Sequence, residues 1–471
     1  MKAARPTRSI WTPELVVLAA LAGLTRFWNL FTPNVVAFDE MHFEHHAGHY
    51  LAGTHYFDVH PPLGKLLFAA EAKFFGISSA TLLAGEPAVA LRVLPACFGA
   101  LIVPLIYVLC RQLGAARRVA ALASFAILCE NALLVDSRFS LLEPFIIGFG
   151  LSAIVLYLAA ARATGFSHWL GLAASALMAG CALSVKWTGL SALGIILSAW
   201  ALDVVLSARR ADQWRRVAIE GLVLVGIPIA VYVSVFAVHF HVLRRTGIDD
   251  AVMSAQFRAT MVGGPMYNPA VHMSLFAKLS DVHKAISRGN SALEGITHAA
   301  ASPWYTWPIM KHPIGLWEGA DAQRPAMVIL LGNPVLWWGS GIAVLVAGVL
   351  FASRRRQWGE HRYALAFLLG AFLLNFLPFI AIRRVMYIYH YLYALLFLIT
   401  LAIMSLGVIA GWNDPDDGSI WRFSSRASAS WYWGVAAMVL LGFLYFAPFS
   451  YGWSLTPTGY DARFWILHPH F

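Results

Sequence analysis

The sequence predicts an all-α integral membrane protein with about eleven transmembrane helices. Of its 471 residues, 59% are hydrophobic and only 12% are charged, whereas a soluble domain carries roughly 25% charged residues. The apolar residues gather in runs of about 17–25, the length that crosses a bilayer as a helix. Lys and Arg cluster in the short connections between these runs, where topology signals sit. We therefore expect one polytopic membrane domain over residues 1–471.

The expected spans follow one another along the whole chain. They cover residues 12–31, 91–112, 118–136, 141–161, 168–185, 187–206, 217–240, 329–352, 363–382, 386–409 and 431–450. The first span follows a basic N-terminus, as a signal peptide does. It has no good small-x-small cleavage site, and its apolar run continues to Phe31, so we expect it to remain uncleaved.

The distribution of Lys and Arg also predicts the orientation, because cytoplasmic loops carry an excess of both. With the N-terminus in the cytoplasm, three basic clusters fall on the cytoplasmic side: Arg111, Arg117 and Arg118; Arg209, Arg210, Arg215 and Arg216; and Arg354, Arg355, Arg356 and Arg362. Two long loops, residues 32–90 and 241–328, and the C-terminus then lie on the external side.

The first external loop is expected to contain a short helix. Leu63, Leu67, Ala70 and Phe74 recur at helical spacing. This helix either lies in the membrane interface or packs on neighbouring loops.

The net charge of +10 does not indicate a nucleic acid partner, because the basic clusters coincide with the expected cytoplasmic loops. Membrane lipids are the expected partners of the apolar surface. The cysteines lie within or at the edges of apolar segments, so no disulfide framework is expected: Cys97, Cys110, Cys129 and Cys181.

Two adjacent carboxylates, Asp39 and Glu40, stand just beyond the first span. Ionised groups near lipid are costly and by default mark function. Together they supply what hydroxyl chemistry needs, a base to take a proton and a second group to orient the nucleophile. We therefore expect Asp39 and Glu40 to be catalytic.

Several cations disobey the positive-inside bias, since they stand at the external face. They are Arg138, Lys186, Arg383 and Arg384. A phosphate ligand would account for them, because Arg binds phosphate bidentately and Lys as a point charge. The alternative is that each reaches up to lipid headgroups.

Four histidines of the first loop have the helical spacing of metal ligands: His42, His45, His46 and His49. Such spacing also arises by chance in a chain with 17 histidines. The favoured interpretation is that neither a metal nor another cofactor is required.

The motifs resemble those of the protein O-mannosyltransferases. Asp39-Glu40-x-His42-Phe43 and Asp58-Val59-His60-Pro61-Pro62-Leu63-x-Lys65-Leu66 match that family's first luminal loop. Further blocks match in the same order along the chain, at residues 131–143, 184–189, 232–257, 302–308, 332–338 and 389–392.

The resemblance implies a GT-C-type glycosyltransferase with about eleven spans. Members transfer mannose, with inversion, from a polyprenyl-phosphate carrier to Ser or Thr hydroxyls of proteins during or after export. Carried onto this chain, Asp39 is the general base and Glu40 helps to place the acceptor. Arg138 holds the donor phosphate, assisted by Lys186 and Arg384. Further substrate-binding residues are His42, Asp58, His60, Trp187 and His390.

Two features depart from the family pattern. The second external loop is too short for the β-trefoil module that eukaryotic members insert there. In addition, Tyr393 occupies the position after Tyr-His-Tyr-Leu, where family members often have Pro. The missing module favours a bacterial cytoplasmic membrane, with the active site on the non-cytoplasmic side.

Two other functions remain open. A related GT-C transferase could move a lipid-phosphate-linked sugar to a lipid or glycan. A transporter or flippase would instead show charged or broken helices near mid-membrane, often in paired halves, and no such repeat is evident.

Overall fold

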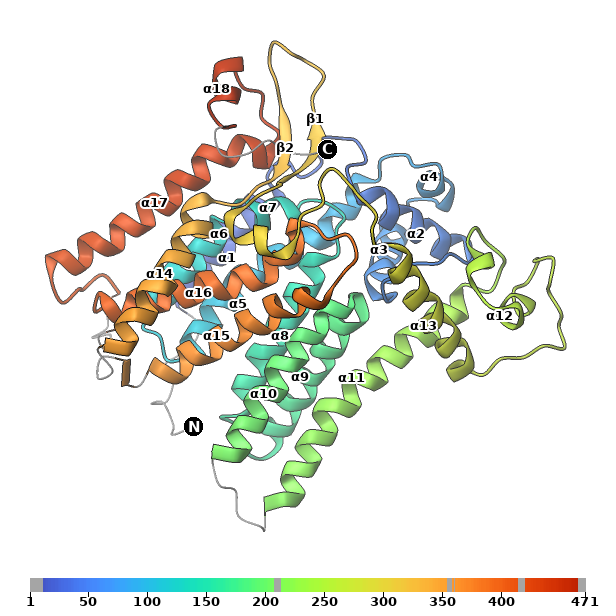
Figure 1. The fold of residues 1–471 in the computed structure, drawn as a ribbon, viewed down its shortest axis with the longest axis horizontal. Coiled ribbons are helices and arrows are strands. Elements are labelled where there is room, and N and C mark those ends of the chain that lie inside the picture. The colour runs from blue at the N-terminus through green and yellow to red at the C-terminus, as the bar shows by residue number, and fades with distance from the viewer. Residues whose placement is uncertain (1–11, 207–212, 354–357, 360, 414–419, 465–471) are drawn as a thin grey trace.

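The protein is described by a computed structural model that covers the chain except residues 1–11, 207–212, 354–357, 360, 414–419 and 465–471. Helices dominate the described part. Their long axes run roughly together in Figure 1, and the elements of the two long loops, residues 32–90 and 241–328, lie along the top and right of the bundle. The prediction of an all-α membrane protein is confirmed, apart from one small hairpin.

Nine helical stretches in the described residues are long and apolar enough to cross a membrane. They are η1 with α5 (Val89–Gln112), α8 (Glu143–Ala160), α9 (Gly165–Val185), η2 with α10 (Trp187–Leu206), α11 (Trp214–Val242), α14 (Pro334–Ala352 of Pro334–Ser353), α15 with η7 (Arg362–Ala381), η8 with α16 (Ile388–Ile409) and α17 (Arg426–Tyr451). These correspond to nine of the expected spans.

The other two expected spans are shorter. The first is α1 (Pro13–Phe27), which ends four residues before the expected end at Phe31. The third is divided into α6 (Arg117–Leu128) and α7 (Asn131–Asp136). Buried Glu130 causes the break, because its side chain accepts hydrogen bonds from the backbone N–H of Leu133 at 2.7 Å and of Asn333 at 2.9 Å. The Glu130 carboxylate thus caps a new helix, α7, and the expected span consists of two helices in place of one.

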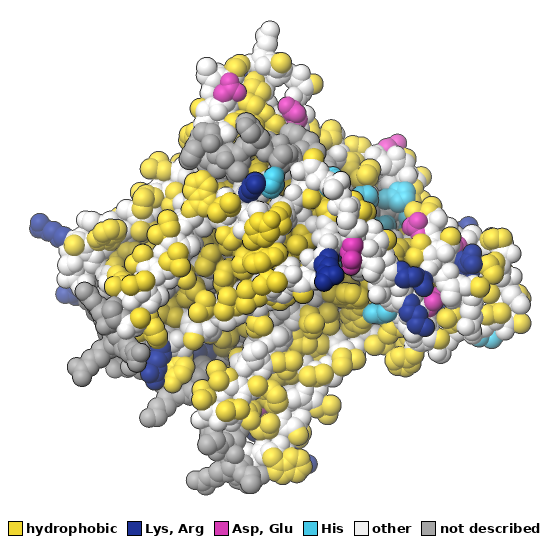
Figure 2. Space-filling view, in the orientation of Figure 1, with side chains coloured by type: hydrophobic (Ala, Val, Ile, Leu, Met, Phe, Trp, Pro, Cys, Tyr) yellow, Lys and Arg dark blue, Asp and Glu magenta, His cyan; other side chains and the backbone are white. Residues whose placement is uncertain are grey.

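The core of the bundle is built around α16 (Leu392–Ile409), which is buried along nearly all of its length. A helix that is apolar on every side belongs at the centre of a bundle. The outer helices instead expose large apolar side chains, such as Leu222 on α11 and Leu345 on α14. Figure 2 shows apolar side chains along the flank of the bundle.

The first external loop contains α2 (Glu40–Ala52), α3 (Leu63–Phe74) and α4 (Ser79–Leu83). The helix α3 occupies the stretch where a short helix was expected. One of its faces is buried, with Phe68 packed between Phe43 of α2 and Phe145 of α8 at ring distances of 6.3 and 5.3 Å. The opposite side leaves Phe74 exposed.

The second long loop contains α12 (Ala255–Ala259), α13 (Leu275–Ala292) and the antiparallel strands β1 (Ile314–Glu318) and β2 (Met327–Leu330). It lies beside the first loop, since Arg245 pairs with both Thr54 and Val262 as isolated β-bridges. The hairpin stands near α17 and the short α18 (Pro457–Asp461) in Figure 1.

The basic clusters used to predict orientation are only partly described. Arg209, Arg210, Arg354, Arg355 and Arg356 lie outside the described residues.

Candidate active site

The Asp39 carboxylate stands at the N-cap of α2 and is half-buried. None of the hydrogen bonds among the described residues engages this carboxylate. Burial, followed by the Glu143 carboxylate, raises the pKa of Asp39 to about 6. His42, Lys186 and His298 act in the opposite direction. Asp39 is therefore a free carboxylate whose pKa lies near neutrality, as suits a general base.

Glu40, the next residue, has a different environment. Its side chain is fully buried and paired with Arg92, whose Nε and Nη2 donate at 2.8 and 2.7 Å. The backbone N–H groups of Ala37 and Ser140 donate to it at 3.0 and 2.9 Å. These four bonds occupy both oxygens, and a contact between Glu40 and the acceptor stays a prediction. Glu40 anchors the start of α2 and thereby holds Asp39.

Lys186 lies at the same end of the bundle, between α9 and η2. Its ammonium donates to Glu143 Oε1 at 2.7 Å and lies 5.1 Å from the centroid of the Tyr389 ring. Both partners of this ion pair are largely buried. Both charges of the pair act on Asp39, in opposite directions. Lys186 is thus brought near Asp39, but its ammonium is already paired with the Glu143 carboxylate.

Arg384 reaches this region from the connection before α16. Its Nη1 donates to the amide oxygen of Asn290 on α13 at 2.6 Å, and its backbone pairs with Glu294. Arg384 acts to lower the pKa of His60 and of Tyr387, so its charge lies near both groups.

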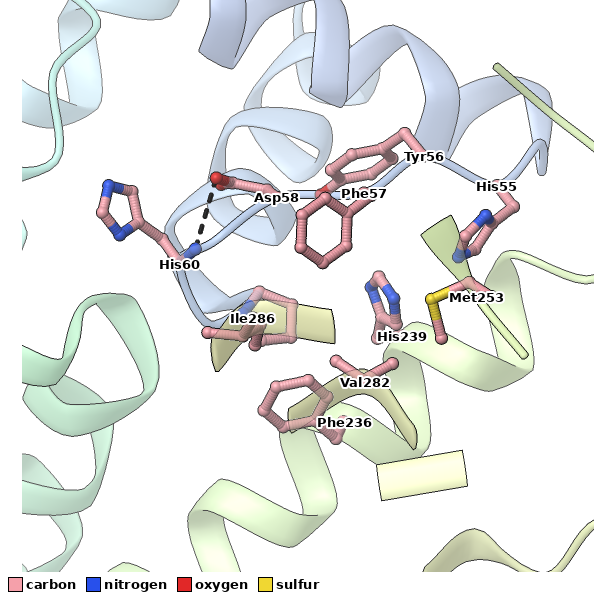
Figure 3. Close-up of a pocket in the computed structure, with 11 residues that line it drawn as sticks. His55, Tyr56, Phe57, Asp58, His60, Phe236, His239, Met253, Val282 and Ile286 are labelled. Carbon is pink, nitrogen blue, oxygen red and sulfur yellow. Dashed lines mark hydrogen bonds between the residues drawn. The ribbon is translucent and has the colours of Figure 1, made fainter. Parts of the chain in front are cut away.

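His60 faces several cations. Burial lowers its pKa well below the usual value, and Lys186, Lys65 and Arg384 lower it further, while Asp58 opposes them. Its imidazole is neutral at neutral pH and keeps one N–H to donate. Figure 3 shows this ring turned away from His239 and Val282.

Asp58 shapes the turn that carries His60. Lys65 donates to Asp58 Oδ2 at 2.6 Å and to the carbonyls of His60 and Pro61 at 2.9 and 2.7 Å. Burial alone would raise the pKa of Asp58, but Lys65 and the nearby histidines lower it overall. Asp58 was predicted to bind substrate; in this structure it is paired within the protein and positions His60.

Arg138 is not brought to Asp39. Its guanidinium donates to the carbonyls of Arg26, Trp28 and Asn29 at 3.0, 2.6 and 3.1 Å. It also lies 4.7 Å from the ring of Tyr451. The last carbonyls of a helix have no partner within the helix, and Arg138 satisfies those at the end of α1. Its role in holding the donor phosphate stays a prediction.

The remaining predicted residues surround the site at different depths. His42 is exposed on α2, one turn after Asp39. His390 stacks on Trp307 and Tyr389, with ring distances of 6.0 and 4.6 Å. Trp187 is 41% exposed and donates from Nε1 to the Tyr232 hydroxyl at 3.0 Å.

The histidines of α2 point in different directions. His45 and His49 contact one another at 3.2 Å, and His49 also contacts the Thr54 hydroxyl at 2.8 Å. His46 stacks on Tyr56 instead, at a ring distance of 4.2 Å. No group of three or more potential ligands is arranged for a metal within the described part of the chain.

A small cavity lies behind His60, between the first loop and the helices α11 and α13. Asp58, His239, Val282 and Ile286 are among the residues that line it (Figure 3). Its volume of about 20 Å³ suits one water molecule. It is too small for a sugar.

Sequence reasoning missed three groups. They are Glu143, the three hydrogen bonds that Lys65 donates to the turn at residues 58–61, and the stacked pair Tyr387 and Tyr389. Glu143 begins α8, and an acidic residue at the edge of an apolar run was a signal that could have identified it. Tyr389 begins a recognised block, and Tyr387 stands two residues before it. Their approach to Asp39 depends on tertiary packing, and nothing local in the sequence indicates it.

Comparison with known proteins agrees with this architecture. Residues 16–244 match the family model for dolichyl-phosphate-mannose-protein mannosyltransferase. Residues 275–468 match the model for the C-terminal four-transmembrane region of protein O-mannosyltransferase. Together the two models cover most of the chain.

Two curated relatives match about half of the chain. Protein O-mannosyltransferase 1 of Drosophila pseudoobscura pseudoobscura is 36% identical over 263 residues, which are 52% of this chain and 29% of that protein. Dolichyl-phosphate-mannose–protein mannosyltransferase 1 of Candida albicans is 34% identical over 274 residues, 54% of this chain and 31% of that protein. The chain thus matches less than a third of the length of either relative.

Solved structures share the fold. The Saccharomyces cerevisiae protein O-mannosyltransferase Pmt1–Pmt2 complex bound to the sugar donor has a TM-score of 0.86 at 19% identity, covering 97% of this chain and 93% of that chain. ArnT from Cupriavidus metallidurans bound to undecaprenyl phosphate has a TM-score of 0.51 at 14% identity, covering 92% and 70%. The fold is therefore GT-C, and the chain belongs to the protein O-mannosyltransferase family.

Proposed function

We propose that this protein transfers mannose, with inversion, from a polyprenyl-phosphate-mannose donor to Ser and Thr hydroxyls of exported proteins. The reaction would take place at the external face of a bacterial cytoplasmic membrane. The observation that carries the proposal is the free, half-buried Asp39 carboxylate, with a pKa of about 6, at the edge of a cationic group of side chains.

Asp39 is the proposed general base. A Ser or Thr hydroxyl is a weak nucleophile until its proton is being removed. At neutral pH Asp39 is ionised and still basic enough to accept that proton in the transition state. His42 lies exposed beside it, at the side from which an acceptor would approach.

The donor phosphate is proposed to bind among Arg384, Lys186, His60 and His390. Arg384 hydrogen-bonds an amide, so it keeps its full charge for an anion. Neutral His60 supplies an N–H, and Lys186 adds a charge that Glu143 partly offsets. This set replaces Arg138 as the proposed phosphate site.

The geometry required by inversion suits these two groups of residues. The base must lie opposite the leaving phosphate across the anomeric carbon. As the sugar bond breaks, the phosphate diester becomes a monoester and gains negative charge. Preorganised cations stabilise that charge strongly in a site shielded from water. Phosphate leaves without protonation, so no general acid is needed, in contrast to the two-carboxylate scheme of glycosidases.

The test uses the purified full chain in lipid nanodiscs with radiolabelled polyprenyl-phosphate mannose and a Ser/Thr-rich peptide. The proposal is supported if the wild-type protein labels the peptide and the Asp39→Asn variant does not. Donor consumption with label on lipid or glycan, but not peptide, would establish the related transferase instead. No consumption of donor by a folded preparation would contradict both.

A further inference from the structure

Phe38, immediately before Asp39, adopts an unusual backbone conformation. Its φ of +51° lies in the left-handed region, where a bulky L residue is strained. Glycine would adopt this conformation freely. A phenylalanine there indicates that its ring has a use that outweighs the strain.

The ring of Phe38 meets a pair of stacked tyrosines from the other end of the chain. It packs edge-on against Tyr387 at 6.1 Å and against Tyr389 at 6.3 Å. The two tyrosine rings stack on one another at 5.5 Å, with an interplanar angle of 20°. Such edge-to-face contacts favour one relative orientation of the rings. The three rings therefore clamp the first external loop to the segment 387–391.

Both sides of this clamp carry proposed active-site groups. Asp39 follows Phe38 directly, and its other neighbour, Glu40, is held by Arg92. On the opposite side, Tyr389 lies under the Lys186 ammonium, and His390 stacks on Tyr389. Asp39 and Arg384 are far apart in the sequence. The clamp nevertheless brings their neighbours Phe38 and Tyr387 to a ring distance of 6.1 Å.

We propose that Phe38 is a positioning residue that sets the distance between the base Asp39 and the phosphate-binding segment 384–391. The proposal rests on the proposed function, because it assigns the two sides of the clamp to the two reacting groups. In a single displacement these groups must lie on opposite sides of the anomeric carbon. A misplacement of about 1 Å can cost on the order of 100-fold in rate.

The experiment measures transfer by the full chain with Phe38→Ala and Phe38→Gly. Both should lower kcat roughly 10- to 100-fold while the donor KM stays within about twofold, since Phe38 touches neither substrate. Phe38→Gly removes the ring but suits the positive φ, so it should retain the wild-type melting temperature better than Phe38→Ala. Phe74→Ala is the matched control, because Phe74 is 83% exposed on the same loop, and it should leave kcat unchanged.

A double-mutant cycle with Tyr387→Ala tests whether Phe38 acts through the clamp. Residues in direct contact give non-additive effects, so Phe38→Ala should cost little further activity when Tyr387 is already Ala. Full additivity, or an unchanged kcat in a folded Phe38→Gly protein, would overturn the proposal. An inactive wild type would overturn the proposed function instead. In that case the same double-mutant cycle, measured by thermal unfolding, would still test the clamp. Additive changes in melting temperature would show that the clamp is absent.

Discussion

Two adjacent carboxylates acquire opposite properties in this protein. Glu40 is the first residue of α2 and turns into the protein, where Arg92 and two backbone N–H groups saturate it. Asp39 remains outside the helix and receives no such bonds. A buried carboxylate whose two oxygens already accept four hydrogen bonds is held in place by the protein. One helix boundary therefore separates the paired carboxylate from the proposed base.

The pH dependence of transfer should report Asp39. Burial and Glu143 raise its pKa to about 6, and only the ionised form can accept a proton. We expect kcat/KM to rise about tenfold per unit below pH 6 and to level off above it. Asp39→Asn should lower kcat roughly 10²–10⁴-fold. A rate that does not change between pH 5 and 7 would contradict this role.

Glu143→Gln should move this pH profile without abolishing activity. The substitution removes the negative charge that raises the pKa of Asp39 and leaves Lys186, which lowers it. The acidic limb of kcat/KM should shift down by about one pH unit. Glu71→Gln is the control, because burial raises the pKa of Glu71 to about 8 and the group is already largely neutral. An unshifted limb in Glu143→Gln would show that the ion pair does not act on Asp39.

At the scale of elements, the first external loop is a packed unit. Its helices α2 and α3 bury facing surfaces around Phe43 and Phe68. Lys65 donates hydrogen bonds to three acceptors of the turn before α3. Arg92 donates to two backbone carbonyls of the segment before α2. These hydrogen bonds satisfy buried polar groups that would otherwise be costly. The loop thus presents Asp39 and His60 from rigid supports.

Removing one partner of the Glu40–Arg92 pair should unfold this unit first. Glu40→Ala leaves a buried, unpaired guanidinium, and breaking a buried ion pair costs about 3–5 kcal/mol. We expect a lower melting temperature in detergent and faster proteolysis within residues 32–90. Glu40→Gln keeps the shape and part of the hydrogen bonding, so it should be intermediate. Normal stability in Glu40→Ala would show that the pair is not a structural anchor.

At the scale of the whole molecule, packing decides which cations serve the site. Arg384 follows Asp39 by hundreds of residues, yet the arrangement of α13 and α16 brings it to the same space. Arg138 belongs to a block that resembles the family pattern, but α1 ends beside it and takes its hydrogen bonds.

The two arginines should therefore fail in different ways. Arg384→Ala should raise the donor KM about 10- to 100-fold, since a charge-assisted hydrogen bond contributes about 1.5–3 kcal/mol. Arg384→Lys should recover part of this loss because it keeps the charge but not the fork. Arg138→Ala should mainly lower the melting temperature, measured alongside the donor KM. The reverse pattern would restore Arg138 as the phosphate ligand.

The sequence alone determined the membrane class, the GT-C family and the short helix at residues 63–74, and it predicted Asp39 as the base. These depend on local composition, spacing and motifs, which packing does not alter. Only the tertiary structure decided that Glu40, Asp58 and Arg138 are bound within the protein, and that Glu143, Phe38 and the tyrosine pair surround Asp39. The reason is physical: a motif names a residue type, but its partner is set by which helix end or carbonyl lies within about 3 Å, and such neighbours are distant in the chain.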